Sequence, residues 1–173
     1  MGRRRLCEQV VHEGPAPVKN RAHTIETRLD LAGGEEGVIV AVGGMTGGYT
    51  MFVKDNRVYY DYNFLDGVHY VLESPPLGDG IIDVRFNFIK TREFGGDGEL
   101  YINGEKVDDV EMPQMHISTY SLAETFDVGR DTGTQVSDSY EGEYKYNGRL
   151  DRVVITVSDE NTVPPRAMPA YNY

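Results

Sequence analysis

The chain contains little of what disulfide-stabilised folds and zinc sites require. Its 173 residues include one cysteine, Cys7, and no tryptophan. A single cysteine excludes an internal disulfide and offers no metal-ligand spacing. Histidine is also sparse, and no two histidines are four residues apart, so we expect structural or surface roles for them rather than a zinc site. The histidines are His12, His23, His69 and His116.

Positive charge is scarce as well. The chain has 17 Lys and Arg against 28 Asp and Glu, which gives a formal net charge of −11. Nucleic acids and anionic membranes favour a basic surface, so neither is expected as a partner. A solvated, self-repelling surface accounts for this acidity better than an acidic binding site does.

Long apolar runs are absent, so the sequence predicts no membrane-spanning helix. The basic start, Arg3 to Arg5, is followed by a polar stretch and not by the apolar segment of a signal peptide. These features favour a cytoplasmic location over secretion.

Helical periodicity is nearly missing, and an alternation of apolar and polar residues takes its place. In residues 81–90, IIDVRFNFIK, the apolar side chains fall on one face and Asp83, Arg85 and Asn87 on the other. Asn103-Gly104 lies between two such runs and predicts a type I′ hairpin. About ten strands are expected, two of them in the 100–107 hairpin and the others in segments 23–31, 37–42, 48–54, 57–63, 67–74, 81–90, 125–129 and 146–157.

This pattern predicts an all-β fold, an antiparallel two-sheet jelly-roll sandwich over residues 21–158. Residues 1–20, which contain Gly14, Pro15 and Pro17, are expected to form a flexible arm or linker. Residues 159–173 form a Pro-rich tail. An irregular stretch over 112–122 has room for a single helical turn.

Motifs that would carry chemistry are weak. The glycine-rich GGMTGG of residues 43–48 lacks the Lys-Ser/Thr ending of a phosphate loop and precedes a strand, so it predicts a β turn. Glu141 and Glu143 are the one tight acidic alternation, and their Gly-containing surroundings favour solvated loop charges over a glycosidase pair. Asp127, Asp131 and Asp138 could offer oxygens to Ca²⁺, although their spacing matches no dedicated calcium loop.

Two phrases, LYINGEKV (100–107) and YNGRLDRVVITV (146–157), resemble phrases of the laminin-G and concanavalin A-like jelly-roll superfamily. A longer stretch, about residues 13–157, resembles the C-terminal β-sandwich domain of long-type bacterial arylsulfatases. FDVGRDTG (126–133) with VSDSY (136–140) is its most specific part, because no generic strand pattern requires that order of Gly, Arg, Asp and Thr.

The resemblance implies an accessory domain rather than an enzyme. The catalytic domain of that family carries a C-x-P-x-R or S-x-P-x-R motif, and neither Cys7 nor Ser74 begins a complete motif of this kind. The implied partner is a sulfatase catalytic domain, in cis or in trans. Arg130, Asp131 and Thr132 would then lie on a loop at the rim of that partner's cleft. Arg130 could instead pair with an aspartate of its own loop.

Two other functions stay open. A carbohydrate-binding, lectin-like module could use an aromatic and polar sheet face that includes Tyr60, Tyr62 and Arg85, although tyrosines at such spacing are also typical of core packing. A self-associating module could use a sheet face or edge. The candidate binding residues are Asp127, Arg130, Asp131, Thr132, Asp138, Tyr60, Tyr62 and Arg85; no catalytic residue, metal ligand or cofactor is assigned.

Overall fold

The computed structural model describes residues 18–65, 67–116 and 126–158, and within these ranges every regular element is a strand. No helix there is long and apolar enough to cross a membrane. The strands are β1 (His23–Leu31), β2 (Gly37–Gly44), β3 (Gly47–Lys54), β4 (Arg57–Leu65), β5 (Val68–Glu73), β6 (Gly80–Arg92), β7 (Gly95–Ile102), β8 (Glu105–Met112), β9 (Phe126–Val128) and β10 (Arg149–Val157).

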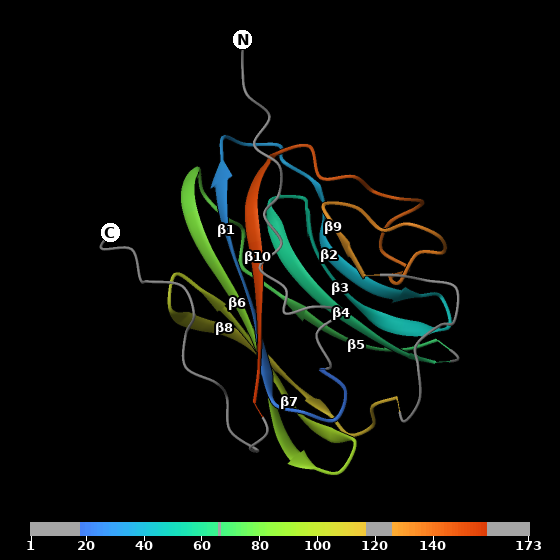
Figure 1. The fold of residues 1–173 in the computed structure, drawn as a ribbon. Coiled ribbons are helices and arrows are strands. Elements are labelled where there is room, and N and C mark those ends of the chain that lie inside the picture. The colour runs from blue at the N-terminus through green and yellow to red at the C-terminus, as the bar shows by residue number, and fades with distance from the viewer. Residues whose placement is uncertain (1–17, 66, 117–125, 159–173) are drawn as a thin grey trace.

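The strands form two antiparallel sheets that pack face to face (Figure 1). The first sheet has the order β10-β1-β6-β7-β8, and the second has the order β5-β4-β3-β2-β9. The chain changes sheets after β1, β5, β8 and β9, while β2 to β5 and β6 to β8 are joined as successive hairpins. The predicted all-β, jelly-roll sandwich is confirmed, and its strands run from His23 to Val157.

Turn chemistry explains why the hairpins close where they do. Asn103 and Gly104 have φ of 53° and 82°, as a type I′ turn requires. Asp55 and Asn56, which join β3 to β4, both have positive φ as well, 49° and 57°. The glycine-rich 43–48 segment is the turn between β2 and β3, so the prediction of a β turn rather than a phosphate loop is confirmed.

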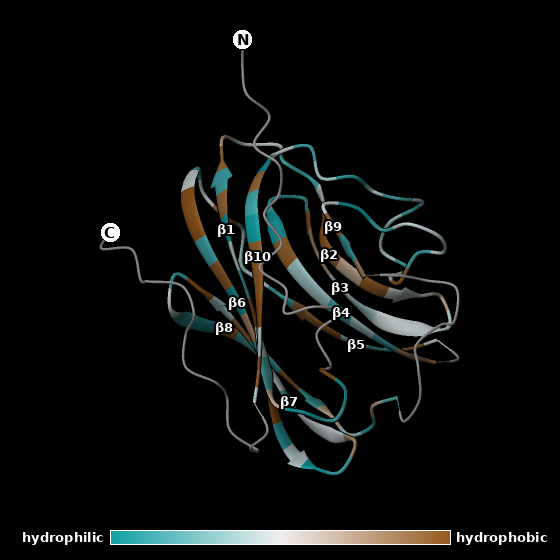
Figure 2. Cartoon of the chain, viewed as in Figure 1, coloured by the Kyte–Doolittle hydropathy of each residue, from teal (hydrophilic) through white to brown (hydrophobic). Residues whose placement is uncertain are grey.

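The core lies between the two sheets and is rich in aromatic side chains. Tyr60 of β4 stacks on Phe86 of β6 across the interface, with ring centroids 3.6 Å apart and an interplanar angle of 9°. Burying a side chain of this size contributes roughly 1.5–3 kcal/mol. The apolar positions of the alternating segments meet here, among them Ile25, Leu29, Met51, Leu72, Val84, Phe88 and Leu100. Figure 2 shows the same alternation as apolar and polar bands along the strands.

Two predicted sugar-binding residues are corrected by this packing. Tyr60 and Tyr62 are each 1% exposed and point into the core, where the Tyr62 hydroxyl accepts a hydrogen bond from the His116 backbone N–H at 2.9 Å. Alternation showed that the two tyrosines share a face. Alternation alone does not show which face of β4 is buried. In the assembled sandwich the first sheet covers the face that carries Tyr60 and Tyr62.

The predicted polar face of β6 does lie on the outside of the first sheet. Asp83 there binds Arg28 of β1, with Arg28 Nε 2.7 Å from Asp83 Oδ1. Residues 1–17 of the predicted 1–20 arm, residues 117–122 of the predicted 112–122 irregular stretch, and the 159–173 tail lie outside the described residues. The predictions made for them stay predictions.

His23 gives the fold a defined pH dependence. Its ring is 1% exposed and lies against Phe86 and Phe88, and burial lowers its pKa from 6.5 to about 4. Below pH 6.5, His23 therefore binds a proton in the unfolded chain but not in the folded chain. We predict a stability loss from His23 that begins near pH 6.5 and reaches about 3 kcal/mol near pH 4.

Urea unfolding followed between neutral pH and about pH 4 measures this loss. His23→Phe keeps an apolar ring in the same place and removes the titrating group. Between neutral pH and about pH 4, the variant should lose less unfolding free energy than the natural chain. The difference should equal the loss assigned to His23. Identical pH profiles for the two chains would show that His23 does not carry the effect.

Candidate functional site

A long irregular loop, residues 129–148, covers the outer face of the second sheet between β9 and β10. Val136 and Tyr140 of this loop pack on Val38, Ala41 and Phe52, and together they form a second buried cluster, separate from the core. The loop also pairs with β2, because the Val38 N–H donates to the Tyr144 carbonyl at 2.7 Å. The second sheet is therefore covered on its outer side over part of its area, and the loop edge borders open sheet surface.

Asp131 holds this loop together from inside. It is 1% exposed, and its Oδ2 accepts the Tyr140 hydroxyl at 2.6 Å and the Val136 N–H at 2.9 Å. The Tyr140 oxygen also lies 3.1 Å from the Thr50 hydroxyl on β3, which ties the loop to the sheet. Burial and the bond to Asp131 both raise the pKa of Tyr140. Tyr140 therefore stays neutral and acts as a permanent donor.

Asp127 and Thr132 close the start of the loop. Asp127, on β9, accepts the Thr132 backbone N–H at 3.0 Å and the Thr132 hydroxyl as well. Arg130, between them, is exposed and its Nη1 lies 4.0 Å from Glu143. The expected alternatives for Arg130 are thereby separated: its guanidinium pairs loosely with Glu143, whereas Asp127 and Asp131 bind loop atoms.

A histidine bridges the next part of the loop to the sheet. His69 Nδ1 of β5 lies 2.8 Å from Asp61 of β4, and His69 Nε2 lies 3.6 Å from Asp138 of the loop. Burial raises the pKa of Asp61, while hydrogen bonds from Ser137 and His69 act in the opposite direction. This bridge was not predicted. The one indication of this bridge in the sequence is Asp61, a carboxylate that lies between two core tyrosines, Tyr60 and Tyr62.

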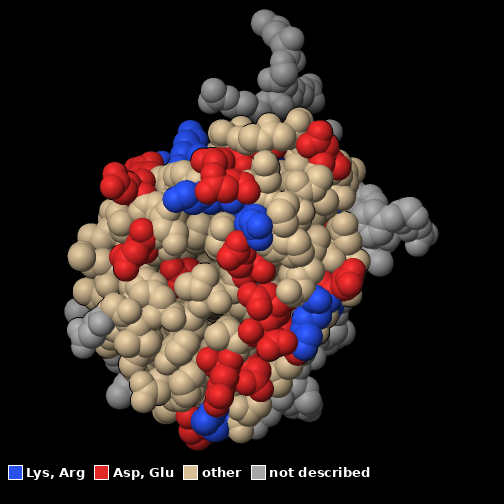
Figure 3. Space-filling model, turned by 180° about the vertical axis from the view of Figure 1, so that it is seen from behind, with Lys and Arg blue, Asp and Glu red and all other residues tan. Residues whose placement is uncertain are grey.

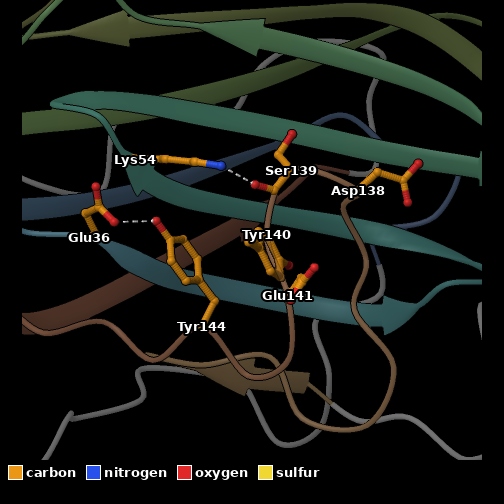
Figure 4. Close-up of a pocket in the computed structure, with 7 residues that line it drawn as sticks. All are labelled: Glu36, Lys54, Asp138, Ser139, Tyr140, Glu141 and Tyr144. Atoms are coloured by element: carbon orange, nitrogen blue, oxygen red, sulfur yellow. Dashed lines mark hydrogen bonds between the residues drawn. The ribbon is translucent and has the colours of Figure 1, made fainter.

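An open hollow of about 480 Å³ lies between the edge of the loop and the ends of β2 and β3. Its lining mixes carboxylates, one amine and two aromatic rings: Glu36, Lys54, Asp138, Ser139, Tyr140, Glu141 and Tyr144. Figure 4 shows Glu36, Lys54 and Tyr144 at one end and Asp138 at the other, with Tyr140 and Glu141 between them. Planar rings beside convergent polar groups are typical of sites for small polar ligands.

Hydrogen bonds and ring stacking fix the lining in place. Lys54 Nζ donates to the Ser139 carbonyl at 2.6 Å, and the Tyr144 hydroxyl donates to Glu36 at 3.0 Å. The Tyr144 ring stacks on Tyr140, with centroids 5.1 Å apart and planes 12° from parallel. Burial and the bond to Glu36 raise the pKa of Tyr144. Glu36, Lys54 and the Ser139 carbonyl are therefore held in place before any ligand arrives.

Tyr144 is held in a conformation that a bulky residue rarely adopts. Its φ is 38°, in the left-handed region that favours glycine and asparagine. Such a residue costs on the order of 1 kcal/mol and persists where surrounding contacts enforce it, often at a functional position. Here the strained backbone places a half-buried aromatic ring on the wall of the hollow.

The predicted site residues are thus divided among several places. Asp138 lines the hollow, while Asp127, Asp131 and Thr132 support the loop that forms its rim. Arg85 lies on the outer face of the other sheet, where its guanidinium carbon is 4.5 Å from the centre of the Tyr101 ring.

Of the seven lining residues, sequence reasoning named only Asp138 as a binding residue and missed the other six, among them Glu36, Lys54 and Tyr144. The tyrosine-rich, non-alternating run over 140–146 was the available signal for Tyr144. Glu36 and Lys54 come from strand ends far away in the chain, and no local pattern connects them.

The three aspartates considered for Ca²⁺ are not brought together. In the part of the chain that the structure describes, no group of three or more His, Cys, Asp or Glu side chains could hold a metal ion. Asp127 and Asp131 instead accept hydrogen bonds from their own loop, and Asp138 faces His69.

No protein-family model matches the chain, and no curated protein matches it by sequence. Solved structures do share its fold. The CBM40 of Ruminococcus gnavus IT-sialidase, bound to α2,3-sialyllactose, aligns with a TM-score of 0.54 and 14% identity over 79% of this chain and 76% of that one. Mouse laminin α1 domains LG4-5 give 0.55 and 12% over 80% of this chain and 37% of that one.

A heptameric SAP-like pentraxin from Limulus polyphemus gives a TM-score of 0.51 and 15% identity over 79% of this chain and 65% of that one. Likeness at such low identity shows the fold alone. The chain therefore has the fold of laminin-G and concanavalin A-like jelly-roll domains, as its hairpin and closing-strand phrases indicated. None of the three structures is a sulfatase.

Asp131 and Arg130 are neighbours with opposite expected effects on stability. We predict that Asp131→Ala lowers the free energy of unfolding by about 3 kcal/mol, because it leaves the Val136 N–H buried without its acceptor and removes the carboxylate that binds the Tyr140 hydroxyl. Arg130→Ala should change it by less than about 0.5 kcal/mol, since an exposed ion pair contributes little. Denaturant unfolding of both variants measures the difference. Equal effects would contradict the assignment of Asp131 as the internal support of the loop.

Proposed function

We propose that this chain is a non-catalytic carbohydrate-binding module that binds its ligand in the hollow beside the 129–148 loop. The observation that carries the proposal is the lining itself, in which the half-buried Tyr144 ring, stacked on the buried Tyr140, lies among preorganised carboxylate, amine and carbonyl groups. Sugar rings present apolar faces that stack on aromatic side chains, and hydroxyls that pair with such polar groups.

The preorganisation of the lining favours binding of a flexible oligosaccharide. Glu36 and Lys54 are already oriented by Tyr144 and Ser139, so little side-chain freedom is lost when a ligand arrives. The hollow is also open, which suits an exposed glycan end better than an enclosed small molecule. The sialyllactose complex of the R. gnavus module supports the proposal, because it is a sugar complex on the same fold.

A ring-removal variant tests this function. Tyr144→Asn tolerates the left-handed backbone and removes the aromatic wall, so it should weaken glycan binding about tenfold or more, which corresponds to one lost stacking contact. Binding is measured by calorimetric titration against a panel of neutral, amino and acidic oligosaccharides. Tyr144→Phe, which keeps the ring, should retain most of the affinity.

Tyr101→Asn, on the other sheet, is the matched control and should bind like the natural chain. The proposal fails if no member of the panel binds the natural chain, or if Tyr144→Asn binds as tightly as Tyr101→Asn does.

A second proposed function rests on the arylsulfatase resemblance: docking of the 125–140 segment on a sulfatase catalytic domain. The exposed side chain of Arg130, which lies 4.0 Å from the Glu143 carboxylate, supports it because the guanidinium has donors to offer a partner. Arg130→Ala should then weaken co-purification with a catalytic domain supplied in trans, while its melting temperature stays unchanged. Failure of the natural chain to associate would exclude this alternative.

A further inference from the structure

The charges of the hollow restrict which sugars it can accept. Its lining has three carboxylates, Glu36, Asp138 and Glu141, against a single amine, that of Lys54. The lining is therefore acidic by two charges, and the whole chain adds to this with its net charge of −11. Figure 3 shows that acidic side chains also form a band across the rear face of the molecule.

The single amine is already engaged. Lys54 Nζ lies 2.6 Å from the Ser139 carbonyl, and this bond holds the loop at the edge of the hollow. Lys54 keeps two further N–H donors, but its one positive charge stands against three carboxylates, so a ligand carboxylate would meet a lining of net negative charge. Like charges placed this close raise the free energy of the complex, and the cost is largest at low salt.

The carboxylates differ in how available they are. Glu36 accepts the Tyr144 hydroxyl and so belongs to the wall. Glu141 is exposed at the rim, and Asp138, with a side chain 88% exposed, faces outward beside His69. Two rim carboxylates thus remain accessible to a cation, and the Tyr144 ring offers an electron-rich face of the kind that attracts ammonium groups.

From this arrangement we propose that the hollow selects amino-sugar glycans with free, protonated amines and rejects glycans that carry carboxylates. The inference rests on the proposed carbohydrate-binding function and names its ligand class. It also separates this chain from the R. gnavus module, whose bound ligand, sialyllactose, carries a carboxylate.

The test compares three probes at slightly acidic pH and low salt: oligomers of glucosamine, oligomers of N-acetylglucosamine of the same length, and sialyllactose. The first two share a backbone and differ in the charge on nitrogen. We expect the glucosamine oligomer to bind about fivefold more tightly than its acetylated counterpart, as exposed charge pairs allow, and sialyllactose to bind most weakly. The preference should shrink at high salt.

Glu141→Gln should reduce the preference for glucosamine by about half or more, because it removes one rim charge and keeps the side-chain shape. Glu105→Gln, an exposed glutamate in the β7–β8 hairpin, removes the same charge elsewhere and should leave the preference unchanged.

The outcomes separate the two proposals. Equal affinity for the two oligomers, or tighter binding of sialyllactose, would overturn the inference and leave the carbohydrate-binding function standing. Absence of binding to all three probes and to the neutral sugars of the wider panel would overturn both.

Discussion

The buried carboxylate of Asp131 is the constraint on which the 129–148 loop depends. A loop of this length without helix or sheet needs partners for its backbone, and Asp131 supplies one to the Val136 N–H while it also accepts the Tyr140 hydroxyl. The Thr50 contact extends the same network to β3. Because the network fixes Tyr140, it also fixes the Tyr144 ring that stacks on Tyr140. The hydrogen bonds of Asp131 inside the loop therefore fix the position of the aromatic wall of the hollow.

The sandwich beneath supplies a rigid platform for this network. Its two sheets are joined by the stack of Tyr60 on Phe86, and their edges by a hydrogen bond from the Glu73 N–H to Asp108. Polar residues on the outer face of β4 and β5, such as Asp61 and His69, then receive the loop. Function placed on loops above a stiff scaffold is common among β-sandwiches. In this chain the loop and the outer sheet face together form the candidate site.

Local patterns in the sequence predicted the fold well because strand alternation and turn chemistry are local properties. Asn103-Gly104 determines its hairpin through positive φ, whatever the rest of the chain does. The site was less accessible to such reasoning. Tyr60 and Tyr62 share a face, yet only the packing of the second layer decides that this face is buried.

Residues from different strand ends were the hardest to connect. Glu36 and Lys54 meet the loop through tertiary contacts that have no sequence period. Asp127, Asp131 and Asp138 were candidates from the sequence, but Asp127 and Asp131 accept hydrogen bonds from loop amides and hydroxyls, and Asp138 faces His69. The most direct measurement of the central claim is nuclear magnetic resonance mapping of amide shifts during titration with a bound oligosaccharide. The account predicts that the shifts gather at residues 138–144 and around Glu36 and Lys54. Shifts gathered instead around Arg85 and Tyr101, on the outer face of the first sheet, would contradict it.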